Sequence, residues 1–158
     1  MNTGYLCNSM KLVRTWIKTL SAVLVFAIAG ALWAQEESLT LTVQVSGAKP
    51  GVGQAIFSLF NSKKTFLETP LQSLEKPIDE NGAAEFRVPG IMPGTYAVAI
   101  VYDEDNSGDL NTGLFGIPTE KVGVSNNHTP RFGPPSYRKS SFEMTESMTL
   151  QIFLQGVE

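Results

Sequence analysis

The chain has 158 residues, with 12 Lys and Arg against 15 Asp and Glu, and a formal net charge of −3. An acidic chain without a stripe of basic residues is a poor candidate for binding nucleic acid. With one histidine and one cysteine, Cys7, which lies ahead of the expected mature chain, the composition also excludes a zinc site built from several such ligands.

Residues 1–34 have the order of a secretory signal peptide. Three basic residues precede an uncharged apolar run from Leu20 to Trp33, and the small residue Ala34 is followed by Gln35 and two glutamates. We expect cleavage after Ala34. The alternative is an uncleaved anchor, but a run of about fifteen apolar residues is short for a bilayer that needs roughly 20. Met10, which precedes a lysine, could be the true start.

Cleavage would leave residues 35–158 as a single exported domain, periplasmic or secreted, without any cysteine. The signal region holds three of the 12 basic residues and none of the 15 acidic ones, so the net charge would change from −3 to −6. Disulfides often stabilise exported domains. This domain is expected to fold without them.

Apolar and polar residues alternate with a period of two along most of this domain, which predicts β-strands. The predicted strands cover residues 38–46, 54–60, 74–78, 84–88, 95–102, 121–125, 141–144 and 148–154. The segment from Thr95 to Tyr102 is apolar on both faces, so we expect a central strand. Asn81-Gly82 predicts one hairpin, and the last two strands predict a second. The pattern indicates an all-β protein, a single antiparallel β-sandwich of about seven to eight strands.

An acidic segment, Asp103 to Asn111, follows the predicted central strand. Its oxygen-bearing side chains alternate along the chain, and Gly108 permits a sharp bend, as a calcium loop requires. The candidate ligands are Asp103, Asp105, Ser107, Asp109 and Asn111. Leu114 occupies the position of the bidentate glutamate of an EF-hand, so that motif is not expected. The alternative is a solvated acidic turn.

A second long loop begins after the strand at 121–125. The candidate binding residues on it are Asn126, His128, Arg131, Phe132 and Tyr137. The alternative is that its aromatic residues and prolines cap the core and stiffen the loop. His128 is the sole histidine and lacks the sequence context of a known catalytic motif. We interpret it as a loop residue, with a small periplasmic hydrolase using His128 as the alternative.

Several ordered segments resemble domain of unknown function 2141, a group of small exported bacterial proteins. The segments are Pro93-Gly94-Thr95-Tyr96-Ala97-Val98, Asp103 to Asp109, Leu114 to Glu120, Val124-Ser125-Asn126 and Phe132 to Tyr137. The similarity extends over roughly Leu39 to Leu154. It implies a transthyretin-like or immunoglobulin-like sandwich, and it brings no established activity, substrate or catalytic residue.

These observations favour an exported, non-enzymatic binding or structural module of the bacterial cell envelope, stabilised by calcium. We expect its two long loops to lie near each other at one end of the sandwich. Its partner would be an unknown envelope or extracellular ligand, and membrane contact would occur only through the transient signal peptide. A further alternative is an accessory subunit with an exposed apolar patch on an edge strand.

Overall fold

The computed structural model describes residues 38–108, 119–130 and 133–156. The predicted signal peptide, Asp109, Asn111, Arg131 and Phe132 lie outside these ranges. Ser38–Glu158 form one compact unit. No helix in the described part of the chain is long and apolar enough to span a membrane.

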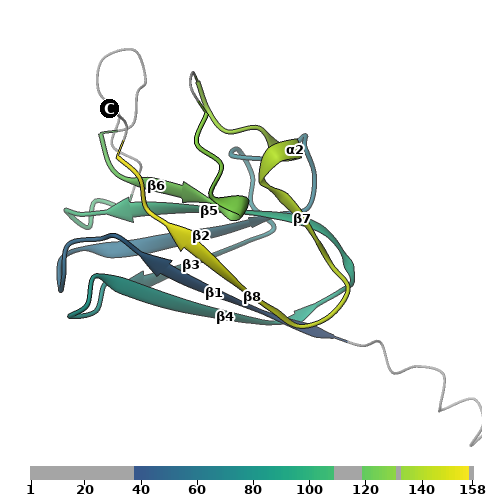
Figure 1. Ribbon diagram of the computed structural model, residues 1–158, viewed down its shortest axis with the longest axis horizontal. Helices are drawn as coiled ribbons and strands as arrows, with labels where there is room; N and C mark the ends of the chain where they lie inside the picture. The colour runs from purple at the N-terminus through teal and green to yellow at the C-terminus, as the bar shows by residue number, and fades with distance from the viewer. Residues whose placement is uncertain (1–37, 109–118, 131–132, 157–158) are drawn as a thin grey trace, which may run out of the picture. The chain divides into compact units, whose positions relative to one another are not determined.

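The described residues form eight strands in two sheets that pack face to face (Figure 1). The strands are β1 (Leu39–Ser46), β2 (Gln54–Phe60), β3 (Gln72–Pro77), β4 (Ala83–Ile91), β5 (Gly94–Asp103), β6 (Val122–Val124), β7 (Ser141–Met144) and β8 (Met148–Phe153). In the described part of the chain, the short helices η2 (Ser125–Asn127) and α2 (Tyr137–Ser140) lie between β6 and β7. One sheet has the order β4-β1-β8, and the other has the order β3-β2-β5-β6, with β7 also paired to β5. All of these pairs are antiparallel except β1–β8. The predicted all-β sandwich is confirmed.

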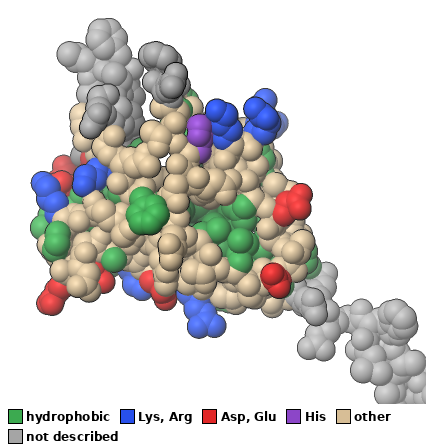
Figure 2. Space-filling view, in the orientation of Figure 1, with side chains coloured by type: hydrophobic (Ala, Val, Ile, Leu, Met, Phe, Trp, Pro, Cys, Tyr) green, Lys and Arg blue, Asp and Glu red, His purple; other side chains and the backbone are tan. Residues whose placement is uncertain are grey.

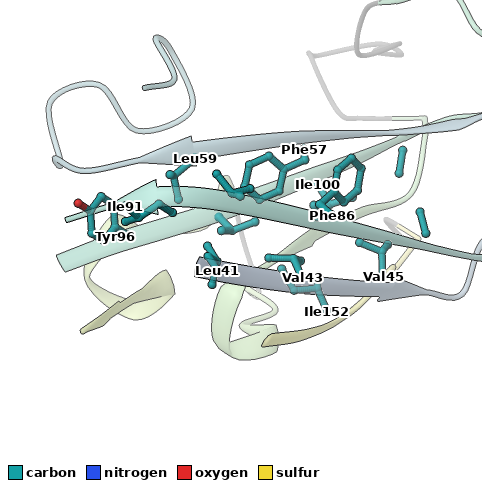
Figure 3. Close-up of a cluster of buried hydrophobic side chains, with 14 of the residues drawn as sticks. Leu41, Val43, Val45, Phe57, Leu59, Phe86, Ile91, Tyr96, Ile100 and Ile152 are labelled. Carbon is teal, nitrogen blue, oxygen red and sulfur yellow. The ribbon is translucent and has the colours of Figure 1, made fainter. Parts of the chain in front are cut away.

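The core lies between the inner faces of the two sheets (Figure 3). In β1 the alternation buries Leu41, Val43 and Val45 and leaves the residues between them half-buried or exposed. Across the core, the rings of Phe57 and Phe86 stack with their centroids 5.3 Å apart. Because these rings come from β2 and β4, their contact joins the two sheets.

Strand β5 is covered on both faces, as predicted from its sequence. Tyr96, Val98, Ile100 and Tyr102 belong to the main core. Ala99, on the opposite face, packs in a small second cluster with Phe60 and Val124, and the half-buried Phe66 covers it. The loop between β2 and β3 therefore forms part of the outer layer over β5.

The two predicted hairpins are wrong. The turn at Asp79–Gly82 has local hydrogen bonds, but it leads from β3 in one sheet to β4 in the other. In the same way β7 pairs with β5, whereas β8 pairs in parallel with β1. An Asn-Gly turn reverses the chain, but the strand that follows takes whichever partner buries its apolar face.

The Asp79 carboxylate stabilises that turn, and this predicts a pH dependence. Its Oδ1 accepts hydrogen bonds from the backbone N–H of Ala83 at 2.9 Å and of Asn81 at 2.8 Å. These two bonds hold the pKa of Asp79 below its ordinary value, although partial desolvation opposes them. A lowered folded-state pKa stabilises the protein above the unfolded-state pKa, and this contribution disappears as the pH falls through the folded-state pKa.

We therefore expect the stability of Asp79→Asn to fall less on acidification than that of the parent protein. The measurement is the urea midpoint of both proteins from about pH 6 to about pH 2. Identical pH profiles would contradict the assignment.

Candidate metal centre and the two long loops

The side chain of Asp103 organises the start of the acidic loop. It ends β5 opposite Gln54, and it is 0 % exposed. Its Oδ2 accepts hydrogen bonds from Gln54 Nε2 and from the backbone N–H of Gly108, both at 2.9 Å. Its Oδ1 accepts one from the backbone N–H of Ser107, also at 2.9 Å. The loop is thereby folded back over the end of β5.

These contacts decide the charge state of Asp103. Burial by itself raises the pKa of this carboxyl, but the hydrogen bonds from Gln54, Gly108 and Ser107 outweigh burial and lower the pKa. Asp103 is therefore an ionised carboxylate at neutral pH, at the bottom of the loop. Ionised oxygen is the ligand that a hard cation such as calcium takes.

Two further carboxylates converge on Asp103. One oxygen each from Asp103, Asp105 and Glu120 lie within 4.8 Å of one another. Asp105 is exposed, whereas Glu120 is only 9 % exposed. The group therefore runs from a buried base to an open rim, which would allow an ion to enter from solvent. The neighbouring Glu104 takes part in a separate contact, an ion pair with Lys49.

The structure brings together some of the ligands predicted from the sequence. Asp103 and Asp105 lie in the cluster, while the backbone N–H of Ser107 donates to Oδ1 of each, at 2.9 and 3.1 Å. Ser107 thus supports both carboxylates through its backbone. Asp109 and Asn111 stay predictions, because they fall outside the described residues.

Sequence reasoning missed Glu120. It lies 17 positions after Asp103 in the chain and next to the start of β6. Because β6 pairs antiparallel with β5, Val122 faces Val101 and the Tyr102 N–H donates to Lys121 O at 2.9 Å. Residues just before β6 therefore lie beside residues just after β5. The predicted strand at 121–125 was the available signal, since antiparallel pairing with β5 would have placed Glu120 there.

The second loop begins with side-chain hydrogen bonds that connect it to α2, β7 and β8. Asn126 and Asn127 both have positive φ, 63° and 50°. Asn126 Nδ2 donates to the carbonyls of Lys139 and Ser141, at 3.0 and 2.9 Å. Asn127 Nδ2 donates to Gln151 O, and its Oδ1 accepts from the Phe153 N–H, both at 2.9 Å. Asn126, predicted as a binding residue, is thus engaged in holding α2 and β7 in place.

The other described candidates of this loop, His128 and Tyr137, do not form a catalytic group with described residues, and Arg131 and Phe132 stay predictions outside the described ranges. The hydroxyl of Tyr137 donates to Thr95 O at 3.2 Å, and its ring packs edge-on against Phe66. His128 is half-buried, and no carboxylate in the described ranges forms an ion pair with it. This geometry gives the hydrolase alternative no support.

The two loops start at different positions along β5. Asp103 ends the strand, whereas Asn126 bonds to Ser141, which faces Ala97 on β5. Six residues of a strand span roughly 20 Å. Further along the second loop, however, the Thr129 hydroxyl hydrogen-bonds to Gln155, which pairs with Val122, two residues after Glu120. The second loop thus begins away from the acidic loop and runs back toward it, and the expectation that the two loops adjoin at one end of the sandwich stays a prediction.

Comparison with known families adds one finding. A family model described as "Uncharacterized protein conserved in bacteria (DUF2141)" matches residues 43–151. The chain belongs to this family. The DUF2141 match runs from within β1 into β8, so it includes both sheets, the acidic cluster and the second loop. It confirms the resemblance seen in the sequence motifs. No curated protein and no solved structure matches the chain.

Proposed function

We propose that this DUF2141 chain is an exported, non-enzymatic binding or structural module of the bacterial cell envelope, held in shape by a calcium ion. Export rests on the signal-peptide pattern of residues 1–34. The single observation that carries the calcium site is the approach of the carboxylates of Asp103, Asp105 and Glu120 to within 4.8 Å.

Calcium suits this group better than a softer metal does. The three side chains offer only oxygen, and calcium takes six to eight oxygen ligands in flexible geometry. Like-charged carboxylates this close raise one another's electrostatic energy, and a divalent cation would relieve it. Asp109 and Asn111 remain the predicted further ligands, and they lie one and three positions after Gly108 in the sequence.

A bound ion would join two segments that are distant in sequence. Asp103 and Asp105 follow β5, and Glu120 precedes β6. An ion held by both would fix the ends of the connection between these strands. Since the ligands converge only in the folded chain, binding would stabilise folding by mass action.

The test is unfolding of residues 35–158 in a calcium buffer and in a chelator. With a Kd of about 10⁻⁴ to 10⁻³ M, as in extracellular modules, about 10 mM calcium should raise the free energy of unfolding by roughly 1.4–2.7 kcal/mol. We expect Asp105→Asn and Glu120→Gln to lose this increase, because each removes one charged ligand and keeps the side-chain size.

Glu104→Gln is the matched control. Glu104 lies between Asp103 and Asp105 in sequence but pairs with Lys49 outside the cluster, so this variant should keep the calcium response. A parent protein whose stability ignores calcium would refute the site. An equal response in all three variants would place calcium elsewhere on the surface.

A further inference from the structure

Four exposed basic side chains gather on the outer layer over β5. Lys63 and Lys64 lie in the loop after β2, and Arg138 and Lys139 lie in α2. Two ring contacts hold these segments side by side, since Phe66 packs against Tyr137 with centroids 5.6 Å apart and against Phe60 at 5.3 Å. Figure 1 shows α2 beside this loop, and Figure 2 shows Lys and Arg side chains at this edge of the molecule as well as at its left and lower edges. We call Lys63, Lys64, Arg138 and Lys139 the basic patch.

The basic patch is separated from the acidic cluster along β5. Phe60, which precedes the loop, faces Ala97, and so does Ser141, which follows α2. The acidic cluster lies at Asp103, the far end of the same strand. A protein whose mature charge is expected to be −6 thus carries four of its exposed cations together in this region.

The four cations of the basic patch form no ion pair with another described residue. Among the described residues the one ion pair joins Lys49 to Glu104, and neither belongs to the patch. The acids on the neighbouring segments are Glu68 in the loop and Glu143 on β7, both exposed. Two acids against four cations leave the region positive, so it can attract an anionic surface.

Exposed leucines accompany these charges. Leu67 and Leu71 are 42 % and 58 % exposed, and they are two of the five large hydrophobic side chains that the described surface exposes. Leu67 has a φ of 63°, a conformation that residues with a branched or bulky side chain rarely adopt. Strained backbone conformations of this kind are concentrated at functional sites. Here the strained residue is one whose apolar side chain is exposed on the loop.

We propose that the basic patch docks on the surface of an anionic phospholipid bilayer, with its cations at the lipid phosphates and Leu67 among the headgroups. Cations next to exposed apolar side chains match the interfacial zone of such a bilayer. A soluble polyanion would use the cations but leave the leucines in water. This inference uses residues outside the candidate calcium site, and it extends membrane contact beyond the expected signal peptide.

The test is co-sedimentation of residues 35–158, which hold the whole described core, with lipid vesicles in the presence of chelator. One set of vesicles is phosphatidylcholine alone, and the other is an equimolar mixture of phosphatidylcholine and phosphatidylglycerol. We expect binding to the mixed vesicles only, weakening as salt is added. The double variants Lys63→Ala with Lys64→Ala, and Arg138→Ala with Lys139→Ala, should each lower partitioning by roughly tenfold or more.

Two further variants separate docking from loss of fold and from general charge. Leu67→Asn should fold normally, because asparagine tolerates positive φ, and should lower partitioning by removing the apolar contact. Lys76→Ala with Arg87→Ala removes the same charge from β3 and β4 and should leave partitioning close to that of the parent.

Equal binding to both vesicle types, no binding, or an equal loss in the β3–β4 control would overturn the proposal. If vesicles are ignored and the patch variants instead abolish concentration-dependent self-association, the basic patch joins copies of the chain and lipid docking is refuted. Because chelator is present throughout, these outcomes are independent of whether calcium binds.

Discussion

Gly53→Ala is expected to lower the free energy of unfolding by about 3 kcal/mol or more. Gly53 has a φ of +70°, and a Cβ built there would lie 2.4 Å from Asp103 O and 2.7 Å from Glu104 Cα. Both atoms belong to the backbone, so no side chain can rotate away to make room. The new methyl group would have to push β2 away from the end of β5, where the candidate metal centre begins.

Gly51→Ala is the matched control in the same turn. Gly51 has nearly the same φ, +67°, but a Cβ there would have no neighbour within 4 Å. It should cost only the backbone strain, about 1–2 kcal/mol. Urea unfolding of both variants measures the difference. Equal losses would mean that the close approach to Asp103 contributes nothing to stability.

Gly53→Ala also tests how the end of β2 supports the acidic cluster. Displacement of Asp103 and Glu104 would move Asp103 relative to Asp105 and Glu120, so we expect the calcium-dependent stabilisation to be lost together with part of the stability. Gly51→Ala should keep it. A Gly53→Ala protein that is destabilised but still responds fully to calcium would show that the cluster tolerates this displacement.

Strands β1 and β5 were predictable because each has a local cause in the sequence. The alternation of β1 follows directly from one buried and one outer face, and the apolar run of β5 follows from burial on both. Both sequence patterns depend only on which faces of the strand are exposed to water. They can therefore be recognised without knowing which strands pair with which.

Strand partners were not predictable in this way. β7 and β8 are separated by only three residues, yet they join different sheets, and β8 runs parallel to β1. Short connections favour a hairpin, but here each strand pairs where its apolar face meets the core, a tertiary choice without a local signal. Glu120 was missed for the same reason, since its position depends on the pairing of β6 with β5.

The second loop shows how a local pattern can mislead about function. The amide of Asn126 looked free to bind a ligand, because polar residues in long loops often do. Its partners are the carbonyls of Lys139 and Ser141, which approach it only after α2 and β7 have packed against β5. Asn126 therefore stabilises the packing of α2 and β7. On this side of the protein, the basic patch supplies exposed charged side chains.

Ser125→Ala is expected to lower the free energy of unfolding by about 2–3 kcal/mol, because Ser125 fills a break in the sheet. On β5, β7 pairs with residues 94–97 and β6 with residues 99–101, so Val98 faces neither strand. The Ser125 hydroxyl accepts the Val98 N–H at 2.9 Å and donates to the carbonyl of Ser140. Ser125 is 0 % exposed, so no bulk water would replace it.

Ser140→Ala, at an equally buried site, should not lower the free energy of unfolding as Ser125→Ala does. Ser140 is also 0 % exposed, but its Oγ has no hydrogen-bond partner within the described structure. Its contact with Ser125 uses the backbone carbonyl, which alanine keeps. Removing an unsatisfied buried hydroxyl should leave stability unchanged or raise it. Urea midpoints of the two variants decide the matter. If Ser140→Ala loses as much stability as Ser125→Ala, volume at this junction matters more than the hydrogen bond to Val98.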